Sequence, residues 1–321
     1  MDKIKKFILL VIAIFVSFVI TEVFIRVVIG YPVSGELMKI IGISGPKSYG
    51  KLYEPHSKYW NVEGGNNVFE RNNVGLPGLD IITSDSTGYV LVLGSSVVEA
   101  QQVPRNQMAT SVFHDLLTKE NDKYQIVNLG TSGVNPYQQW FRTCYFESLY
   151  EPSVVIMVLD EHSYEYLSRI KSQKLNFDLP NRFGEEHDIS LTKQISHFLK
   201  NNLSTLNILF QNIHNLQPTK KQDNKKYAKY DVDISLEKLE ICISEFQKKY
   251  KEKFILISIL NDKEINNEIQ KICNNKKLNY FIDDSTQSSI NRFHGTGHLN
   301  VRGNRGLGVL LHEVFKKSFI E

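Results

Sequence analysis

The chain has 321 residues, of which 41% are hydrophobic and 23% are charged, and its formal net charge is +3. This length fits one domain of ordinary size with an anchor, and the composition is that of a globular protein with a sizeable core, which argues against global disorder. The weak positive charge, without a basic stripe interleaved with aromatic residues, gives no support for a nucleic-acid partner.

The N-terminus carries a candidate membrane anchor. Three lysines among the first six residues precede an apolar segment over residues 7–29, which only Glu22 and Arg26 interrupt. A helix over this segment would be about 34 Å long, enough to cross a bilayer. A signal peptide is the rival interpretation, but no small-x-small cleavage site follows, so we expect a retained anchor. The positive flank predicts a single-pass protein of the cell membrane, with its main domain extracytoplasmic.

After a cytoplasmic tip and anchor over residues 1–30, residues 31–85 are irregular and rich in Gly, Asn, Tyr and Pro, which predicts a stalk and lead-in. A regular pattern then begins, and residues 86–321 are predicted to form the main domain. Strands are predicted over residues 89–93, 125–129, 154–159, 254–260 and 280–282, and helices over residues 107–117, 136–150, 234–250, 264–274 and 303–317. This alternation predicts a parallel sheet with helices on both faces.

The segment over residues 163–233 breaks the alternation. It contains an amphipathic stretch over residues 191–213 and then a polar run rich in lysine. We interpret it as a helical insertion between the third and fourth strands, forming either a lid or a surface for a protein partner that the sequence does not identify.

The three cysteines do not form a metal-binding pattern. Cys144, Cys242 and Cys273 are far apart and none belongs to a CxxC motif, so each is interpreted as a small core residue. A Cys242–Cys273 disulfide stays open if the domain lies in an oxidising compartment.

Three segments carry residues suited to acyl-transfer chemistry. Ser96 follows the first predicted strand in the sequence Gly94-Ser95-Ser96, and the C-terminal ends of parallel strands border the ligand crevice. His298 precedes the last helix and is a base only if it reaches that hydroxyl. The segment from Asn128 to Gly133 contains two glycines after the second strand, where backbone N–H groups suit an oxyanion site. Taken singly, each segment also fits an ordinary turn or loop.

In this order the three segments resemble the conserved blocks of SGNH (GDSL-like) hydrolases. Gly94-Ser95-Ser96 is similar to the first block, usually Gly-Asp-Ser, and Gly297-His298-Leu299-Asn300 resembles the last. The resemblance implies a three-layer α/β/α flavodoxin-like fold, without a metal or cofactor. It also implies Ser96 as nucleophile, His298 as base, and Ser96, Gly133 and Asn128 at the oxyanion. The lead-in over residues 73–78 is similar to a segment of anchored members that accompany cell-surface polysaccharide assembly.

The third family block departs from the pattern. Where that block supplies an asparagine, this chain has Asp160 followed by Glu161 and His162. An ionised Asp160 would repel an oxyanion, so it could serve only if protonated or turned away. His162 and Asn135 are the other substitutes left open.

The family aspartate before the base is also missing from residues 292–297. His294 is a nearby substitute, and Asp283 and Asp284 are expected to be solvated loop acids. A Ser-His dyad oriented by a backbone carbonyl is therefore expected.

Two functions follow from these features. The first is an extracytoplasmic serine esterase or O-acyl (acetyl) transferase that acts through this dyad on an acylated cell-surface glycan or another ester. The alternative is a catalytically degenerate SGNH-fold protein that binds or assembles components in surface polysaccharide biosynthesis.

Overall fold

The computed structural model describes residues 2–28, 39–42, 48–53, 55–61, 67–82, 88–120, 123–170, 174–178, 231–283, 286, 288–293 and 297–320. The amphipathic stretch over residues 191–213, the lysine-rich run, His294 and Asp284 lie outside these ranges. The predictions made for them are therefore not tested.

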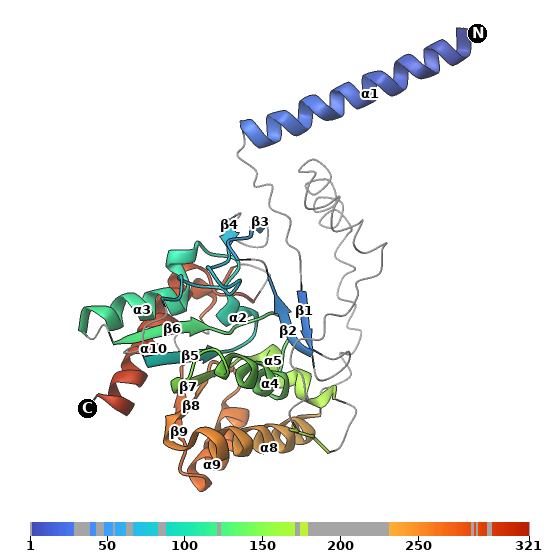
Figure 1. The fold of residues 1–321 in the computed structure, drawn as a ribbon. Coiled ribbons are helices and arrows are strands. Elements are labelled where there is room, and N and C mark those ends of the chain that lie inside the picture. The colour runs from blue at the N-terminus through green and yellow to red at the C-terminus, as the bar shows by residue number, and fades with distance from the viewer. Residues whose placement is uncertain are drawn as a thin grey trace.

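Helix α1 (Asp2–Val27) forms from the N-terminal apolar segment (Figure 1). The span Lys3–Ile25 contains an 18-residue window with a mean hydropathy of 2.9, and this length and composition are sufficient to cross a membrane. Most of its apolar side chains are exposed, as expected of a helix whose apolar surface is not covered by the protein itself. A signal sequence would have the same properties.

The main sheet has five parallel strands in the order β6-β5-β7-β8-β9. Its strands are β5 (Gly88–Leu93), β6 (Tyr124–Asn128), β7 (Pro152–Leu159), β8 (Phe254–Ser258) and β9 (Asn279–Ile282). Numbered within the sheet, this is the flavodoxin-like order 2-1-3-4-5. The predicted fold is confirmed, and the five predicted strands are the five observed.

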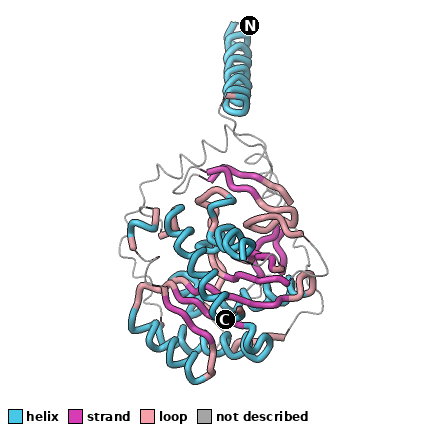
Figure 2. The backbone as a smooth tube through the Cα atoms, turned by 90° about the vertical axis from the view of Figure 1, so that its left-hand side faces the viewer, coloured by secondary structure: helices cyan, strands magenta, loops and turns pink. Residues whose placement is uncertain are grey.

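Helices cover both faces of this sheet (Figures 1 and 2). Among the described residues, the α-helices that follow β5 are α2 (Ser96–Glu99), α3 (Ala109–Glu120), α4 (Pro136–Glu147), α5 (Glu161–Ser168), α8 (Val232–Tyr250), α9 (Lys263–Asn275) and α10 (Val301–Phe319). Short 3-10 turns are η1 (Arg105–Gln107), η2 (Lys251–Lys253) and η3 (Ser289–Asn291).

The alternation of side chains along each strand divides the core into two layers. Leu91 and Leu93 of β5 point into one core cluster, which includes residues of α4, α8 and α9. Val90 and Val92 point into the other, which includes residues of α3 and α10. A strand buried on both faces requires an unbroken apolar run, which explains the composition of β5 and β7.

The three cysteines are buried with free thiols, so the disulfide left open between Cys242 and Cys273 is not formed. Burial raises the pKa of the Cys273 thiol to about 12 and that of Cys144 to about 11. These thiols are therefore neutral core groups at physiological pH.

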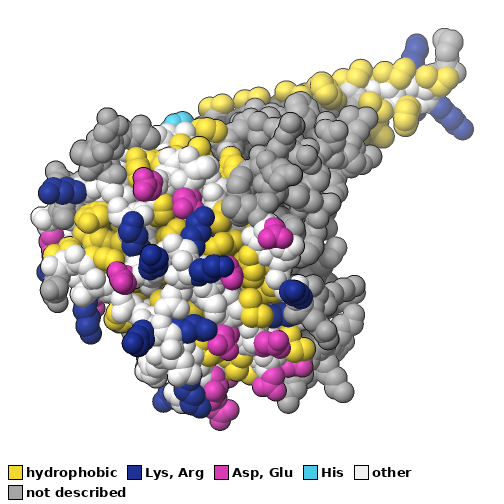
Figure 3. Space-filling view, turned by 60° about the horizontal axis from the view of Figure 1, so that its bottom comes forward, with side chains coloured by type: hydrophobic (Ala, Val, Ile, Leu, Met, Phe, Trp, Pro, Cys, Tyr) yellow, Lys and Arg dark blue, Asp and Glu magenta, His cyan; other side chains and the backbone are white. Residues whose placement is uncertain are grey.

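The surface of the described residues is mixed in charge. On the face in Figure 3, lysine and arginine side chains alternate with aspartate and glutamate, and neither sign forms a continuous block.

Two antiparallel hairpins precede the main sheet. They pair β1 (Lys39–Gly42) with β2 (Ser48–Leu52), and β3 (Lys58–Asn61) with β4 (Asn67–Glu70). Phe69 of β4 is fully buried, and so is Leu76 in the segment that follows. Residues 67–82, predicted as part of a stalk and lead-in, therefore pack into the domain.

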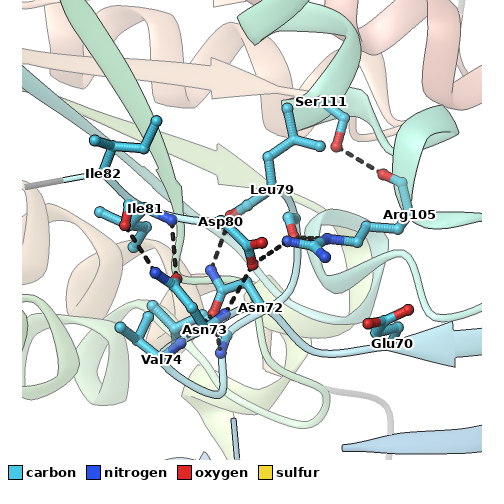
Figure 4. Close-up of polar contacts among 12 residues, drawn as sticks. Glu70, Asn72, Asn73, Val74, Leu79, Asp80, Ile81, Ile82, Arg105 and Ser111 are labelled. Atoms are coloured by element: carbon cyan, nitrogen blue, oxygen red, sulfur yellow. Dashed lines mark hydrogen bonds and ion pairs between the residues drawn. The ribbon is translucent and has the colours of Figure 1, made fainter. Parts of the chain in front are cut away.

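The lead-in loop, residues 71–82, is fastened by side chains (Figure 4). Asn72 Oδ1 accepts from the N–H groups of Val74 and Leu76 at 3.0 and 2.9 Å, while Asn73 Oδ1 accepts from Ile81 N at 2.9 Å. Arg105 donates to the Gly78 carbonyl oxygen at 2.6 Å. Side-chain bonds of this kind replace the ladder bonds that a loop lacks.

Gly308 sets the contact between α10 and α3. Substitution by alanine would place Cβ 2.6 Å from Val112 Cβ and 2.7 Å from the Ala109 carbonyl oxygen. We expect Gly308→Ala to lower the free energy of unfolding by about 1–3 kcal/mol, the usual range for overpacking. Chemical denaturation measures the change.

Gly306 is the matched control, because it lies on the same helix and a Cβ there would have no described atom within 4 Å. Gly306→Ala should raise the free energy of unfolding by about 0.5–1 kcal/mol through helix propensity. Equal effects at the two positions would contradict this description of the helix contact.

Candidate active site

Ser96 lies where β5 ends and α2 begins, at the C-terminal edge of the sheet. Gly94 permits this sharp turn, because a Cβ at residue 94 would lie 2.2 Å from Val98 Cγ2. Ser96 is partly exposed, and within the described part of the chain its backbone N–H donates no hydrogen bond. The first N–H groups of a helix have no intrahelical acceptor, so this group is available to a ligand.

The structure brings His298 to Ser96 across 202 positions of sequence. The Nε2 atom of His298 lies 2.9 Å from Ser96 Oγ, within hydrogen-bond distance. Both side chains are partly exposed. For Nε2 to accept from the hydroxyl, the neutral ring must carry its proton on Nδ1. This is the arrangement of a nucleophile and a general base.

Asparagines hold the loop that carries His298. Asn300 caps α10 by accepting from Gly303 N at 3.0 Å, and its Nδ2 donates to the Ile290 carbonyl oxygen at 2.8 Å. Asn304, one turn further, donates to the Leu299 carbonyl oxygen at 3.0 Å and accepts from the N–H of Ala109. Asn304 was not predicted from the sequence, although its four-residue spacing from Asn300 puts both on one helix face.

The loop after β6, residues 130–133, lies directly against α2, and we name it the second-block loop. A Cβ at Gly130 would be 2.4 Å from the backbone nitrogen of Glu99, so only glycine allows this approach. Gly133 has φ +79° and is exposed. Its N–H forms no hydrogen bond within the described residues. The role of Gly133 as an oxyanion donor stays a prediction.

Asn128 differs from the expectation. Its side chain is 1% exposed, and its Nδ2 donates to the Val98 carbonyl oxygen at 2.8 Å and to Thr110 Oγ1 at 2.9 Å. Its Oδ1 accepts from Gly130 N. Because both amide hydrogens are used inside the protein, Asn128 has none left for an oxyanion, and we assign it to loop support.

Asp160 is also committed to the protein interior. Its carboxylate accepts from Ser95 Oγ and, as the N-cap of α5, from Ser163 N at 2.7 Å. The bond to Ser95 ties the end of β7 to the turn that carries Ser96. A carboxylate that accepts these bonds is not an oxyanion donor, so Asp160 does not replace the missing asparagine.

The remaining substitutes fall in different places. Asn135 is buried as the N-cap of α4, where its Oδ1 accepts from Gln138 N at 3.0 Å. His162 is exposed on the first turn of α5 and stacks with Tyr166 at a centroid distance of 6.3 Å. Asp283 is 6% exposed, so the expectation of a solvated acid is wrong for this residue.

A buried ion pair lies behind the turn that carries Ser96. Arg71 of the lead-in loop donates to Glu99 Oε1 at 2.8 Å, and the two side chains are 1% and 0% exposed. Glu99 Oε2 accepts from both the N–H and the hydroxyl of Ser132, at 2.7 and 2.5 Å. A second buried arginine, Arg142, donates to the Leu129 carbonyl oxygen. None of these charges was singled out from the sequence, because nothing local marks a charge as buried.

The electrostatics of this cluster favour an ionised Glu99. Burial by itself raises the pKa of Glu99, but the adjacent Arg71 and the hydrogen bonds from Ser132 outweigh burial and hold this pKa below its ordinary value. Burial lowers the pKa of Arg142 to about 10, against the attraction of Glu99. Both groups are therefore charged near neutral pH.

The depressed pKa predicts loss of stability in acid. Glu99 titrates at its ordinary value of 4.5 when unfolded and at a lower value when folded. The contribution of Glu99 to the free energy of unfolding is therefore complete above the unfolded pKa of 4.5. It is lost as the pH falls through the lower, folded pKa. Chemical denaturation across this range should show a steeper acid decline for the wild type than for Glu99→Gln, by at most about 1.4 kcal/mol per pH unit. Parallel curves would contradict the assignment.

Comparisons with known proteins give structural matches only. No family model and no curated protein matches the sequence. One match is the structure of a psychrotrophic esterase from Pseudoalteromonas sp. inhibited by monoethylphosphonate. It is 11% identical to this chain with a TM-score of 0.45, and the match covers 73% of this chain and 100% of that chain. A lipase/acylhydrolase from Enterococcus faecalis is 14% identical with a TM-score of 0.42, covering 72% and 96%.

A member of the lipolytic G-D-S-L family from Veillonella parvula is 12% identical with a TM-score of 0.41, covering 72% and 100%. The chemistry proposed below rests on the geometry of Ser96 and His298. The order of the five parallel strands by itself makes the fold flavodoxin-like.

Proposed function

We propose that the protein is a serine esterase or O-acyl transferase in which Ser96 and His298 form a catalytic dyad. The observation that carries this proposal is the 2.9 Å separation between Ser96 Oγ and His298 Nε2. The two side chains come from loops 202 positions apart and are both partly exposed, so a substrate can reach them. A hydroxyl with a base in hydrogen-bond reach is the requirement for nucleophilic catalysis.

The proposed reaction has two halves. Ser96 Oγ attacks the ester carbonyl carbon while His298 Nε2 takes the hydroxyl proton, and collapse of the tetrahedral intermediate expels the alcohol, which receives that proton. The acyl group is then bound to Ser96. In the second half His298 activates water, giving a carboxylic acid, or a sugar hydroxyl, giving a new ester.

Backbone N–H groups are proposed to stabilise the oxyanion. The candidates are Ser96 and Gly133, neither of which donates a hydrogen bond within the described part of the chain. Each such donor contributes on the order of 10²–10³ in rate where it has been removed from a serine hydrolase. Gly133 contributes because its positive φ lets the chain turn at the loop without a side chain over the site.

The proposed substrate is an acylated cell-surface glycan, met on the extracytoplasmic side of a membrane in which α1 is the single anchor. Support comes from the length and hydropathy of α1 and from the lysines that precede it. The similarity of residues 73–78 to a segment of anchored members is consistent with this location.

A second candidate function is a non-catalytic binding or assembly role. The observation that favours it is Asp160, which stands where the family has an oxyanion-binding asparagine and accepts from Ser95 and Ser163. For this role we expect surface glycan fragments to bind equally to the wild type and to Ser96→Ala, with no ester turnover by either.

The dyad is tested with a chromogenic acetyl ester and with a fluorophosphonate, using the full chain in detergent. Attack by Ser96 forms an oxygen–phosphorus bond and releases fluoride, so mass spectrometry should place the adduct on Ser96. Ser96→Ala and His298→Ala should each lower kcat by at least about 10³-fold, because the nucleophile and its base act as a unit.

Ser244→Ala is the matched control, since Ser244 is a partly exposed helical serine that donates to the Glu240 carbonyl oxygen. It should retain full turnover and labelling. Turnover by Ser96→Ala equal to that of the wild type would rule out the dyad.

A further inference from the structure

Glu99 occupies an unusual position for a buried carboxylate. It ends α2, the single turn that begins with Ser96, and it is 0% exposed. Its Oε1 accepts a hydrogen bond from Arg71, and its Oε2 accepts one from the N–H and one from the hydroxyl of Ser132. Ser132 immediately precedes Gly133 in the second-block loop.

Glu99 therefore holds the second-block loop at two points. The backbone of Gly130 lies against the backbone nitrogen of Glu99, where a Cβ would come within 2.4 Å. The carboxylate fixes Ser132 at 2.7 Å through its N–H and at 2.5 Å through its hydroxyl. With both contacts made by the turn that carries Ser96, the loop cannot shift without disturbing that turn.

A buried carboxylate persists only with compensation, which Arg71 supplies. The guanidinium carbon of Arg71 lies 3.7 Å from the centroid of the Tyr53 ring and 4.5 Å from that of Phe69, so the cation is itself held between aromatic rings. Such contacts fix the guanidinium plane as well as its position. Arg71 of the lead-in loop thus holds a positive charge in a fixed position beside Glu99.

We propose that Glu99 and Arg71 are positioning residues that set the second-block loop, and with it the Gly133 N–H, at the place where charge develops on the substrate carbonyl oxygen. This inference rests on the proposed esterase function. Neither residue touches the substrate. Their effect is transmitted through Ser132, which acts as the link between the buried carboxylate and the exposed glycine.

The ionised form of Glu99 is essential to this role. A carboxylate can accept on both oxygens, whereas the amide of Gln has one acceptor and one donor end. In Glu99→Gln the amide oxygen will face the cationic Arg71, and the NH2 group will then face the N–H of Ser132. Two donors repel, so the loop moves although the side chain keeps its size.

The experiment measures kcat and KM for the acetyl ester, and the rate of fluorophosphonate reaction with Ser96, in the full chain below the unfolding temperature of every variant. Glu99→Gln is expected to lower kcat by about 10–100-fold with KM changed less than about twofold, since an oxyanion contact acts mainly in the transition state. Labelling of Ser96 should slow in parallel, because phosphonylation also places negative charge on an oxygen in that site.

Glu147→Gln is the matched control. Glu147 forms an ion pair with Lys249 at 2.8 Å and accepts from the Tyr250 hydroxyl, and none of these residues contacts Ser96, His298 or the second-block loop among the described interactions. The same chemical change there should leave kcat and labelling unaltered. Chemical denaturation of both variants measures any loss of stability separately from the loss of turnover.

Ser132→Ala covers the case in which Glu99→Gln does not fold. Ser132 lies at the surface, and its loss removes one of the two bonds to Glu99 while leaving the backbone N–H. A several-fold fall in kcat with unchanged KM is expected.

The outcomes separate the two proposals. If the wild type turns over the ester and both Glu99→Gln and Ser132→Ala have the wild-type kcat, the positioning role is overturned and the esterase proposal stands. A rise in KM at unchanged kcat would also overturn it, as a sign of substrate binding. A wild type that neither turns over ester nor reacts with the phosphonate would overturn the esterase and this inference together.

Discussion

Parallel pairing of β5 with its neighbours on both sides is the constraint on which the rest of the structure depends. It places the ends of β5, β6 and β7 at one edge, and the loops continue the register: the Thr131 N–H donates to the Gly94 carbonyl oxygen at 3.2 Å beyond the last ladder pair. A backbone bond therefore joins the turn that precedes Ser96 to the second-block loop. The sheet brings the two loops to one edge, and the side chains of Glu99 and Arg71 are proposed to set the final position of the second-block loop.

Buried polar groups then fix that edge from beneath. Asp160 joins β7 to Ser95, Asn128 supports the second-block loop, and Glu99 receives the lead-in through Arg71. Each group is satisfied on several sides, which is the condition under which buried polar networks add rigidity instead of costing stability. A candidate site assembled from short loops needs such support, because loops lack the ladder bonds of a strand.

The fold was predictable because its signals are local. The apolar runs of β5 and β7 identify buried strands, and their alternation with helices gives the parallel order. Ser96 and His298 were predicted because each stands at a strand end or helix start within a short motif. The roles of Arg71, Glu99 and Asn128 depend on tertiary contacts across 28 to 30 positions, where neither spacing nor composition reveals the partner. The capping of α5 by Asp160 had a readable sign, a serine three residues later.

The 202 positions between Ser96 and His298 also have a consequence for biosynthesis. Arg71 and Glu99 are separated by only 28 positions, so the carboxylate can find its counter-ion soon after both leave the ribosome. His298 reaches Ser96 only when α10 docks on the domain, which brings together two parts of the chain that are 202 positions apart. A polypeptide that ends before residue 298 thus holds Ser96 without the imidazole, so the proposed dyad can form only after α10 has been made and has docked.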